Sequence, residues 1–156
     1  MISLTVGNSV FNDSTTSGLN NVAQTLASEV NTVVTSAGMM QAGSVYHLVN
    51  IPSTVNARGY AVNLSSDKFS YILIVYIPGN PQIKAVVRLN FGFNSSSISG
   101  IALCQPVKNS LCPQGLLPPP KSVSPTSGFF SGSRNIVIWA TTNGVNITAG
   151  FGELQN

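Results

Sequence analysis

The spacing of apolar residues changes once along this chain, from a helical period to a strand period, near residue 40. Before that point, apolar residues recur every three or four positions and therefore fall on one face of an α-helix; they are Leu19, Val22, Leu26, Val30, Val33 and Ala37. Hydroxyls at residues 14–17 can cap this helix, and Gly38 can end it. A helix with one apolar face cannot bury that face alone, so we expect it to pack on a sheet or on other helices.

After Gly43, apolar and polar residues alternate, which is the pattern of β-strands. The alternating segments are 45–51, 60–64, 69–77, 82–91, 98–104, 135–142 and 145–151. The length of 156 residues suits one domain with a sizeable core. We therefore predict a mainly β fold, a long N-terminal helix (1–40) packed on a mainly antiparallel β-sandwich (41–156) of about seven strands.

The last two strands are predicted to form a hairpin around Asn143-Gly144, the preferred pair for a tight type I′ turn. That turn would place Thr142 opposite Val145. One face of the hairpin would then be apolar, and the other would be wetter and would carry Trp139 and Asn146. Upstream, the proline-rich segment 113–128 predicts an extended surface loop without regular strand pairing. A docking ligand for a proline-reading domain is the alternative for this segment.

Charge is scarce in this chain, and this limits where it can work. Charged residues make up 7% of it, where about a quarter is usual. Solubility must come from Ser, Thr, Asn and Gln or from attached sugar, and four glycosylation sequons are present, at Asn12, Asn63, Asn94 and Asn146. Both observations point to an extracellular protein. The seven cations are scattered, which argues against a nucleic-acid partner.

Two cysteines, Cys104 and Cys112, enclose seven residues. In a chain that carries sequons, so close a pair predicts a disulfide that closes a small loop. Two buried free thiols are the alternative. A zinc site is disfavoured because His47 is the only histidine and a tetrahedral site needs four ligands.

The residues needed for catalysis do not gather in the sequence. The four carboxylates are spread from one end of the chain to the other. His47 alternates in phase with apolar neighbours, which is typical of a half-buried strand histidine rather than a general base. No nucleophile elbow or phosphate loop is present. We therefore predict a protein that is not an enzyme and needs no cofactor.

Two phrases that follow the helical stretch are Val49-Asn-Ile-Pro-Ser-Thr-Val55 and Gly59-Tyr-Ala-Val-Asn-Leu64. With the helix before them, they resemble the archaeal type IV pilin superfamily, which includes pilins, archaellins and archaellum accessory proteins. The resemblance covers roughly residues 19 to 65. It implies an immunoglobulin-like β-sandwich that faces outward. It also implies an N-terminal helix whose apolar half, preceded by a cleaved signal, first anchors the precursor in the membrane and later packs in the filament core.

Residues 1–156 lack the cleavage signal and the full apolar helix of that superfamily, so we expect a missing upstream segment that contacts the membrane. The leading hypothesis is a filament subunit that self-associates through an assembly helix, with contacts to other copies from Leu19, Val22, Leu26, Val30 and Val33. The alternative is an accessory or minor pilin-like protein that binds the surface layer or another surface ligand. An extracellular hydrolase is a third, weaker hypothesis.

Overall fold

The computed structural model describes residues 2–66, 71–89, 100–106, 112, 113 and 115–155; for residues 2–13, 66 and 100 it describes the backbone alone. The chain begins with one helix, α1 (Ile2–Gly38). The strands that follow are β1 (Gly43–Leu48), β2 (Ala61–Ser66), β3 (Tyr71–Ile77), β4 (Asn80–Leu89), β5 (Gly100–Leu103), β6 (Val123–Thr126), β7 (Gly128–Phe130), β8 (Ile136–Thr142) and β9 (Asn146–Leu154). An N-terminal helix followed by a β-sandwich is confirmed. The finer immunoglobulin-like class stays a prediction.

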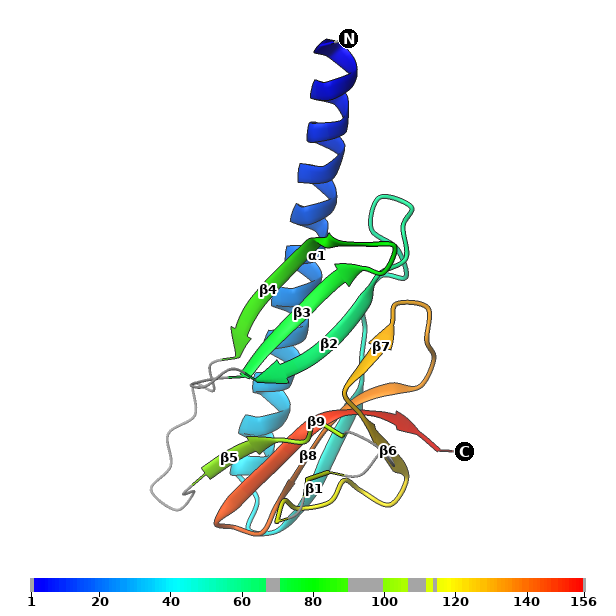
Figure 1. The fold of residues 1–156 in the computed structure, drawn as a ribbon. Coiled ribbons are helices and arrows are strands. Elements are labelled where there is room, and N and C mark those ends of the chain that lie inside the picture. The colour runs from blue at the N-terminus through cyan, green and yellow to red at the C-terminus, as the bar shows by residue number, and fades with distance from the viewer. Residues whose placement is uncertain (1, 67–70, 90–99, 107–111, 114, 156) are drawn as a thin grey trace.

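The strands form two sheets, which Figure 1 shows one above the other. The four-stranded sheet has the order β4-β3-β2-β7, and the five-stranded sheet has the order β1-β8-β9-β5, with β6 also paired to β9. The pairings are antiparallel except that of β5 with β9, which is parallel. The expectation of a mainly antiparallel arrangement is therefore confirmed.

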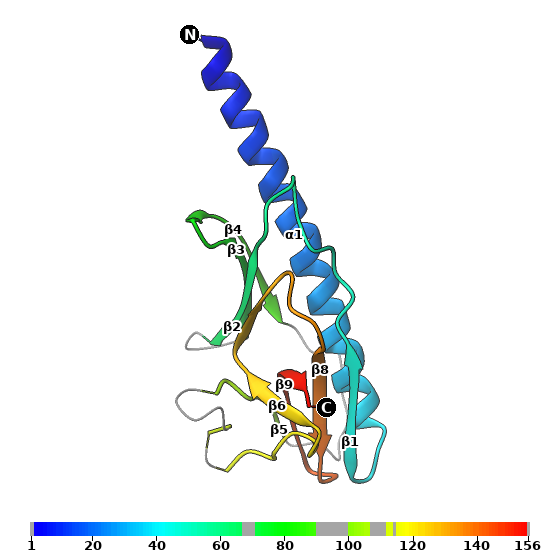
Figure 2. The same ribbon diagram turned by 90° about the vertical axis from the view of Figure 1, so that its right-hand side faces the viewer.

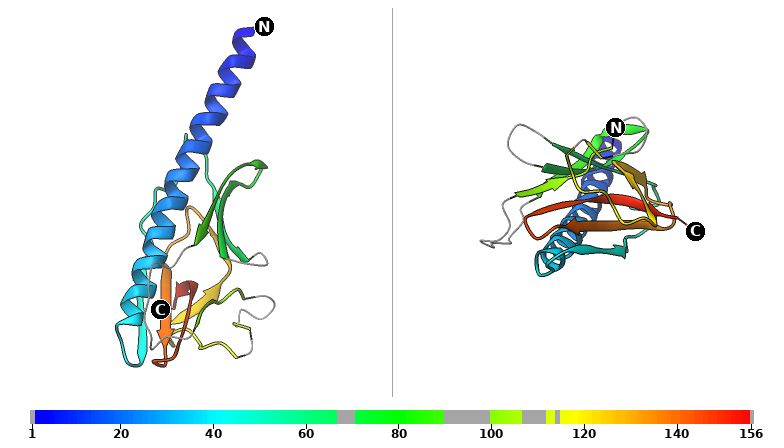
Figure 3. Two further views of the ribbon diagram at one scale, coloured as in Figure 1. Left: turned by 90° about the vertical axis from the view of Figure 1, so that its left-hand side faces the viewer. Right: turned by 90° about the horizontal axis from the view of Figure 1, so that it is seen from below.

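Helix α1 lies along both sheets, and its N-terminal part extends beyond them (Figures 1, 2 and 3). It contacts β3 and β4 of one sheet and β1, β8 and β9 of the other. Its apolar stripe forms one core with the inner faces of the two sheets. The sheets also meet directly, where the rings of Phe129 and Phe151 pack edge to face with centroids 5.2 Å apart. The predicted boundary near residue 40 thus separates helix from strands within a shared core.

The outer face of β8 and β9 differs from the expectation of a wetter surface. Val137 and Trp139 are fully buried and form a second, smaller core with Cys104 and Val123. The indole Nε1 of Trp139 donates a hydrogen bond to the Phe151 carbonyl at 3.1 Å. This face is dry because β5 and β6, both paired to β9, carry the segments that cover it.

The register of the last hairpin also differs from the prediction. Thr142 pairs with Ile147 rather than with Val145, so the connection is wider than a two-residue turn. A type I′ turn needs positive φ at both central residues, and of the pair Asn143-Gly144 only Gly144 has it. The Asn143 side-chain oxygen instead accepts hydrogen bonds from the backbone N–H groups of residues 145 and 146. The slip is two residues, so each side chain keeps its predicted face.

The proline-rich segment is partly strand, which corrects the prediction of a loop without pairing. Strand β6 pairs with β9, and β7 pairs with β2. Pro125 lies opposite Gly152 in β6, which pairs only with β9 among the described residues. Proline is tolerated at such an edge because the N–H that it lacks would otherwise point away from the ladder.

Candidate functional site

The most distinctive feature of the molecule is the part of α1 that projects beyond the sheets (Figure 1). A helix of 37 residues is about 55 Å long. The β-domain meets it from Thr15 onward, where the Asn56 side chain donates a hydrogen bond to the Thr15 hydroxyl at 3.0 Å. The projecting part, residues 2–14, is therefore about 20 Å long. In sequence it contains Ile2, Leu4, Val6, Val10 and Phe11.

The segment between β1 and β2 holds the helix where it leaves the domain. A Cβ added to Gly18 of α1 would overlap a methyl group of Val55, so the Val55 side chain lies directly against the helix backbone. Val55 is itself fixed, because it exchanges two backbone hydrogen bonds with Arg58 at 2.8 and 3.0 Å. The buried Tyr60 hydroxyl donates a hydrogen bond to the Pro52 carbonyl. Residues 52–60, which include the end of the first phrase and the start of the second, thus form a clamp against the helix.

The five residues expected to contact other copies are buried within this chain. Each is 0–3% exposed, and they face the inner sides of the two sheets; they are Leu19, Val22, Leu26, Val30 and Val33. Ala23 and Val34, which widen the stripe, are also fully buried. Two sheets, rather than one, cover the helix, and this accounts for the width of its apolar face. These residues therefore have no surface left for another copy.

The exposed face of α1 over the domain is polar and carries no charge. From residue 14 to residue 38 its exposed side chains are Ser14, Thr16, Ser17, Asn20, Asn21, Gln24, Thr25, Ser28, Thr32 and Ser36. Such side chains can hydrogen-bond to a neighbouring helix without the cost of burying a charge. None of the helices in the described part of the chain is apolar over enough residues to traverse a lipid bilayer.

The sequons differ in how they present their acceptor residues. Asn63 and Asn146 are both exposed, as predicted. Ser65 of the first sequon is half-buried and shares a strand face with Asn63, whereas Thr148 of the second is 2% exposed. The Thr148 hydroxyl accepts a hydrogen bond from the backbone N–H of Leu117 at 3.0 Å. Asn94 and the side chain of Asn12 lie outside what the structure describes. Glycosylation of all four stays a prediction.

The predicted disulfide is confirmed. Cys104 and Cys112 are bonded, and their Cα atoms are 5.0 Å apart. Both residues pack on the small core around Trp139, so the bond lies against the outer face of the sheet. The alternative of two free thiols is wrong.

Glu29 of α1 and His47 of β1 interact electrostatically where the helix contacts the edge strand. Burial raises the pKa of Glu29, while the charge of His47 and a hydrogen bond from the Asn50 backbone lower it. One carboxylate oxygen of Glu29 is buried without a hydrogen-bond partner. His47 is half-buried, as expected from its phase in the strand. Among the described residues, no three His, Cys, Asp or Glu side chains gather as a metal site would require.

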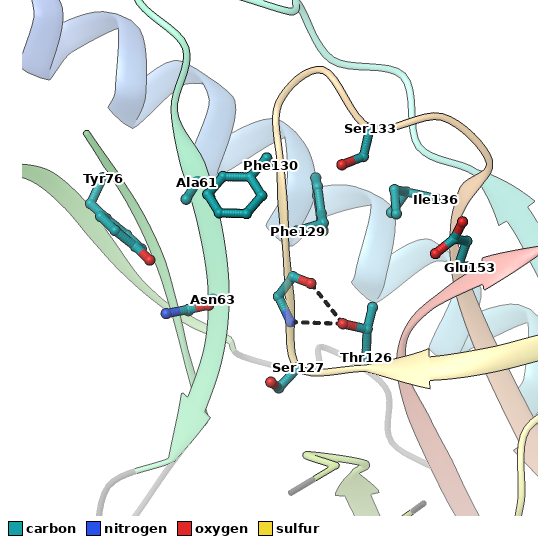
Figure 4. Close-up of a pocket in the computed structure, with 11 residues that line it drawn as sticks. Ala61, Asn63, Tyr76, Thr126, Ser127, Phe129, Phe130, Ser133, Ile136 and Glu153 are labelled. Atoms are coloured by element: carbon teal, nitrogen blue, oxygen red, sulfur yellow. Dashed lines mark hydrogen bonds between the residues drawn. The ribbon is translucent and has the colours of Figure 1, made fainter. Parts of the chain in front are cut away.

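A hollow of about 370 Å³ opens beside β2 and β7 (Figure 4). Its walls include the aromatic rings of Tyr76, Phe129 and Phe130 and the polar side chains of Asn63, Ser133 and Glu153. A second hollow of about 350 Å³ adjoins it and shares Phe129, Ser133 and Ile136. Sequence reasoning missed the first hollow. One signal was available, because consecutive strand residues point to opposite faces, so one of the pair Phe129-Phe130 had to leave the core.

No family model matches this chain, and no curated protein or solved structure is significantly similar to it. The resemblance to the pilin superfamily therefore depends on the two sequence phrases and the helix before them.

Proposed function

We propose that this chain is an extracellular structural subunit of an archaeal type IV pilus-like filament, with no enzymatic activity. The observation that supports the proposal is the division of α1 into two parts. One part is buried in a β-domain, and the other projects from it (Figure 1). A subunit that assembles through its helix needs this shape, because the projecting part must reach the helices of other subunits while the β-domain stays outside the filament core.

The clamp around residues 52–60 supports the same division of roles. Close contact between Val55 and Gly18 fixes the direction in which the helix leaves the domain. A fixed direction lowers the entropy cost of assembly, because the helix is already ordered before it meets a partner. The clamp overlaps both phrases that carry the superfamily resemblance, at residues 52–55 and 59–60.

The partners follow from this arrangement. In this proposal the projecting part of α1 contacts other copies or other filament proteins, and an upstream apolar segment holds the precursor in the membrane before assembly. The β-sandwich, immunoglobulin-like in this proposal, faces the medium. Its scarcity of charge and its exposed sequons at Asn63 and Asn146 suit an extracellular surface. No nucleic acid or cofactor is part of the proposal.

The test is to express the complete gene product, with its native upstream sequence, in a host that exports it, and to examine cells by electron microscopy. We expect surface filaments that contain the chain. Val6→Asp and Val10→Asp, in the projecting part, should abolish filaments while the far-ultraviolet circular dichroism of the purified domain stays unchanged. Gln82→Asp, at an exposed position on β4, is the matched control and should assemble normally.

Two results would contradict the proposal. One is a complete gene product that is exported as a soluble monomer without attachment to cells. The other is attachment to the surface layer with no filaments, which would favour the accessory protein instead.

A further inference from the structure

The hollow beside β2 has an aromatic ring on each side of a small residue. In the strand register, Ala61 of β2 lies opposite Tyr76 of β3 on one side and opposite Phe130 of β7 on the other. The three side chains share the outer face of the four-stranded sheet, as Figure 4 shows. Phe130 is 64% exposed, whereas its neighbour Phe129 is in the core. The row therefore forms a shallow depression with apolar walls.

Asn63 stands at one end of this depression. It is two residues beyond Ala61 on the same face of β2, which corresponds to about 6.6 Å along the strand. Gly128 lies opposite it, and a Cβ there would overlap the Asn63 side-chain oxygen, so the amide lies directly against the β7 backbone. Ser65, the other half of the sequon, is next on the same face. An exposed acceptor amide thus adjoins an exposed aromatic surface.

The chemistry of the hollow suits a neutral sugar. Among the residues that the structure describes, its lining contains no Lys or Arg, which disfavours phosphate or another acidic ligand. Aromatic faces accept the C–H face of a pyranose ring, and polar groups at the edge can bind its hydroxyls. Edge groups of this kind are Ser127, Ser133 and Glu153. A sugar packed on the exposed ring of Phe130 would be stabilised, because the apolar surface of the ring would be removed from water.

We propose that Asn63 carries an N-linked glycan that folds back into this hollow, with its first sugars packed on Phe130 and Tyr76. The inference does not depend on the filament proposal, since any exported chain could carry this modification. Asn146 offers a contrast within the same molecule. Its sequon hydroxyl, on Thr148, is buried and hydrogen-bonded to Leu117, and its exposed apolar neighbour Val145 is not aromatic.

Occupancy is measured first. The chain is expressed in a host that transfers N-glycans during export, and the tryptic peptide 59–68, which holds Asn63 as its only sequon, is weighed by mass spectrometry. We expect a glycan mass on this peptide in the wild type and in Ser65→Thr, and none in Ser65→Ala. An unmodified Asn63 in the wild type would overturn the proposal, whether or not free oligosaccharide binds the hollow.

Contact between glycan and ring is measured next. With the glycan, the melting temperature should exceed that of Ser65→Ala by roughly 2–4 °C, the shift expected for one aromatic contact in a domain of this size. In a Phe130→Ala background the same comparison should give less than about 1 °C. Val145→Ala, an exposed apolar truncation elsewhere, is the matched control and should leave the difference intact.

Nuclear magnetic resonance gives a second readout that does not depend on stability. Protons of the first sugar should move upfield through the ring current of Phe130 and should return to ordinary positions in Phe130→Ala. The proposal would be overturned if Asn63 carried a glycan whose protons showed no such shift and which raised the melting temperature equally with and without the Phe130 ring.

Discussion

Gly18→Ala should destabilise this protein, although the same change stabilises most helices. In an unobstructed helix interior, replacing Gly by Ala gains about 1 kcal/mol, because the flexible glycine loses more backbone entropy on folding. Here the added Cβ would overlap one methyl of Val55 and would lie 3.6 Å from its other two side-chain carbons. The structure therefore sets a steric cost against the gain in helix propensity.

Val55 cannot easily yield to the new methyl group. Its χ1 is restricted because the side chain is β-branched, and its backbone is held by the hydrogen-bonded pair with Arg58. Overpacking of this kind costs roughly 1–3 kcal/mol. Subtracting the gain of about 1 kcal/mol leaves a net loss of about 1 kcal/mol, or a melting temperature lower by roughly 2–4 °C.

A double-mutant cycle isolates this contact. In a Val55→Ala background the overlap is gone, so Gly18→Ala should now raise stability by about 1 kcal/mol, and the coupling between the two sites should be about 2 kcal/mol. Stabilities are measured by urea unfolding followed by circular dichroism. Gly132→Ala, where the added Cβ meets nothing within 4 Å, is the control. An equal rise in stability from Gly18→Ala in both backgrounds would refute the steric argument.

Three other changes test the rest of the fold. Reducing the bond between Cys104 and Cys112 should cost roughly 2–3 kcal/mol, because a short loop regains its freedom when unfolded; urea unfolding with and without reductant measures this loss. The pKa of Glu29 in the folded state lies above its usual 4.5, so protonated Glu29 should stabilise the fold below that pH, and this stability should be lost as pH rises through the folded-state pKa. The melting temperature should fall over that range, and Glu29→Gln should flatten the fall. Trp139→Phe should cost about 1–3 kcal/mol, since the Phe151 carbonyl loses its buried donor, and an unchanged unfolding midpoint would contradict that role.

The sequence predicted the elements and their faces better than it predicted their partners. Periodicity identified α1 and most strands because a strand residue's face depends only on its parity. The register of the last hairpin failed because the Asn143 side chain bonds to residues 145 and 146, a local choice that competes with the type I′ turn. Strand β6 was missed because proline disfavours strands in general, although the edge position of Pro125 tolerates it.

The candidate site was only partly predictable. The disulfide followed from spacing, and the exposure of Asn63 and Asn146 followed from strand alternation. The depression between Tyr76 and Phe130 depends on which strands pair with β2. Its pairing with β3 joins neighbouring segments, but its pairing with β7 places Ala61 opposite the distant Phe130. Alternation within one strand carries no information about such neighbours.

An amphipathic stripe on a helix shows that something covers it but does not show what. In this chain the covering surface is the chain's own pair of sheets, since every residue of the predicted stripe is buried without a partner molecule. A charged substitution there, such as Val30→Asp, would act through folding and could not report on assembly. Any assembly surface on residues 14–38 must then use the uncharged polar face. Within α1, the apolar residues left for assembly are those that the sequence places in the projecting part, from Ile2 to Phe11, and substitutions there can separate filament formation from folding.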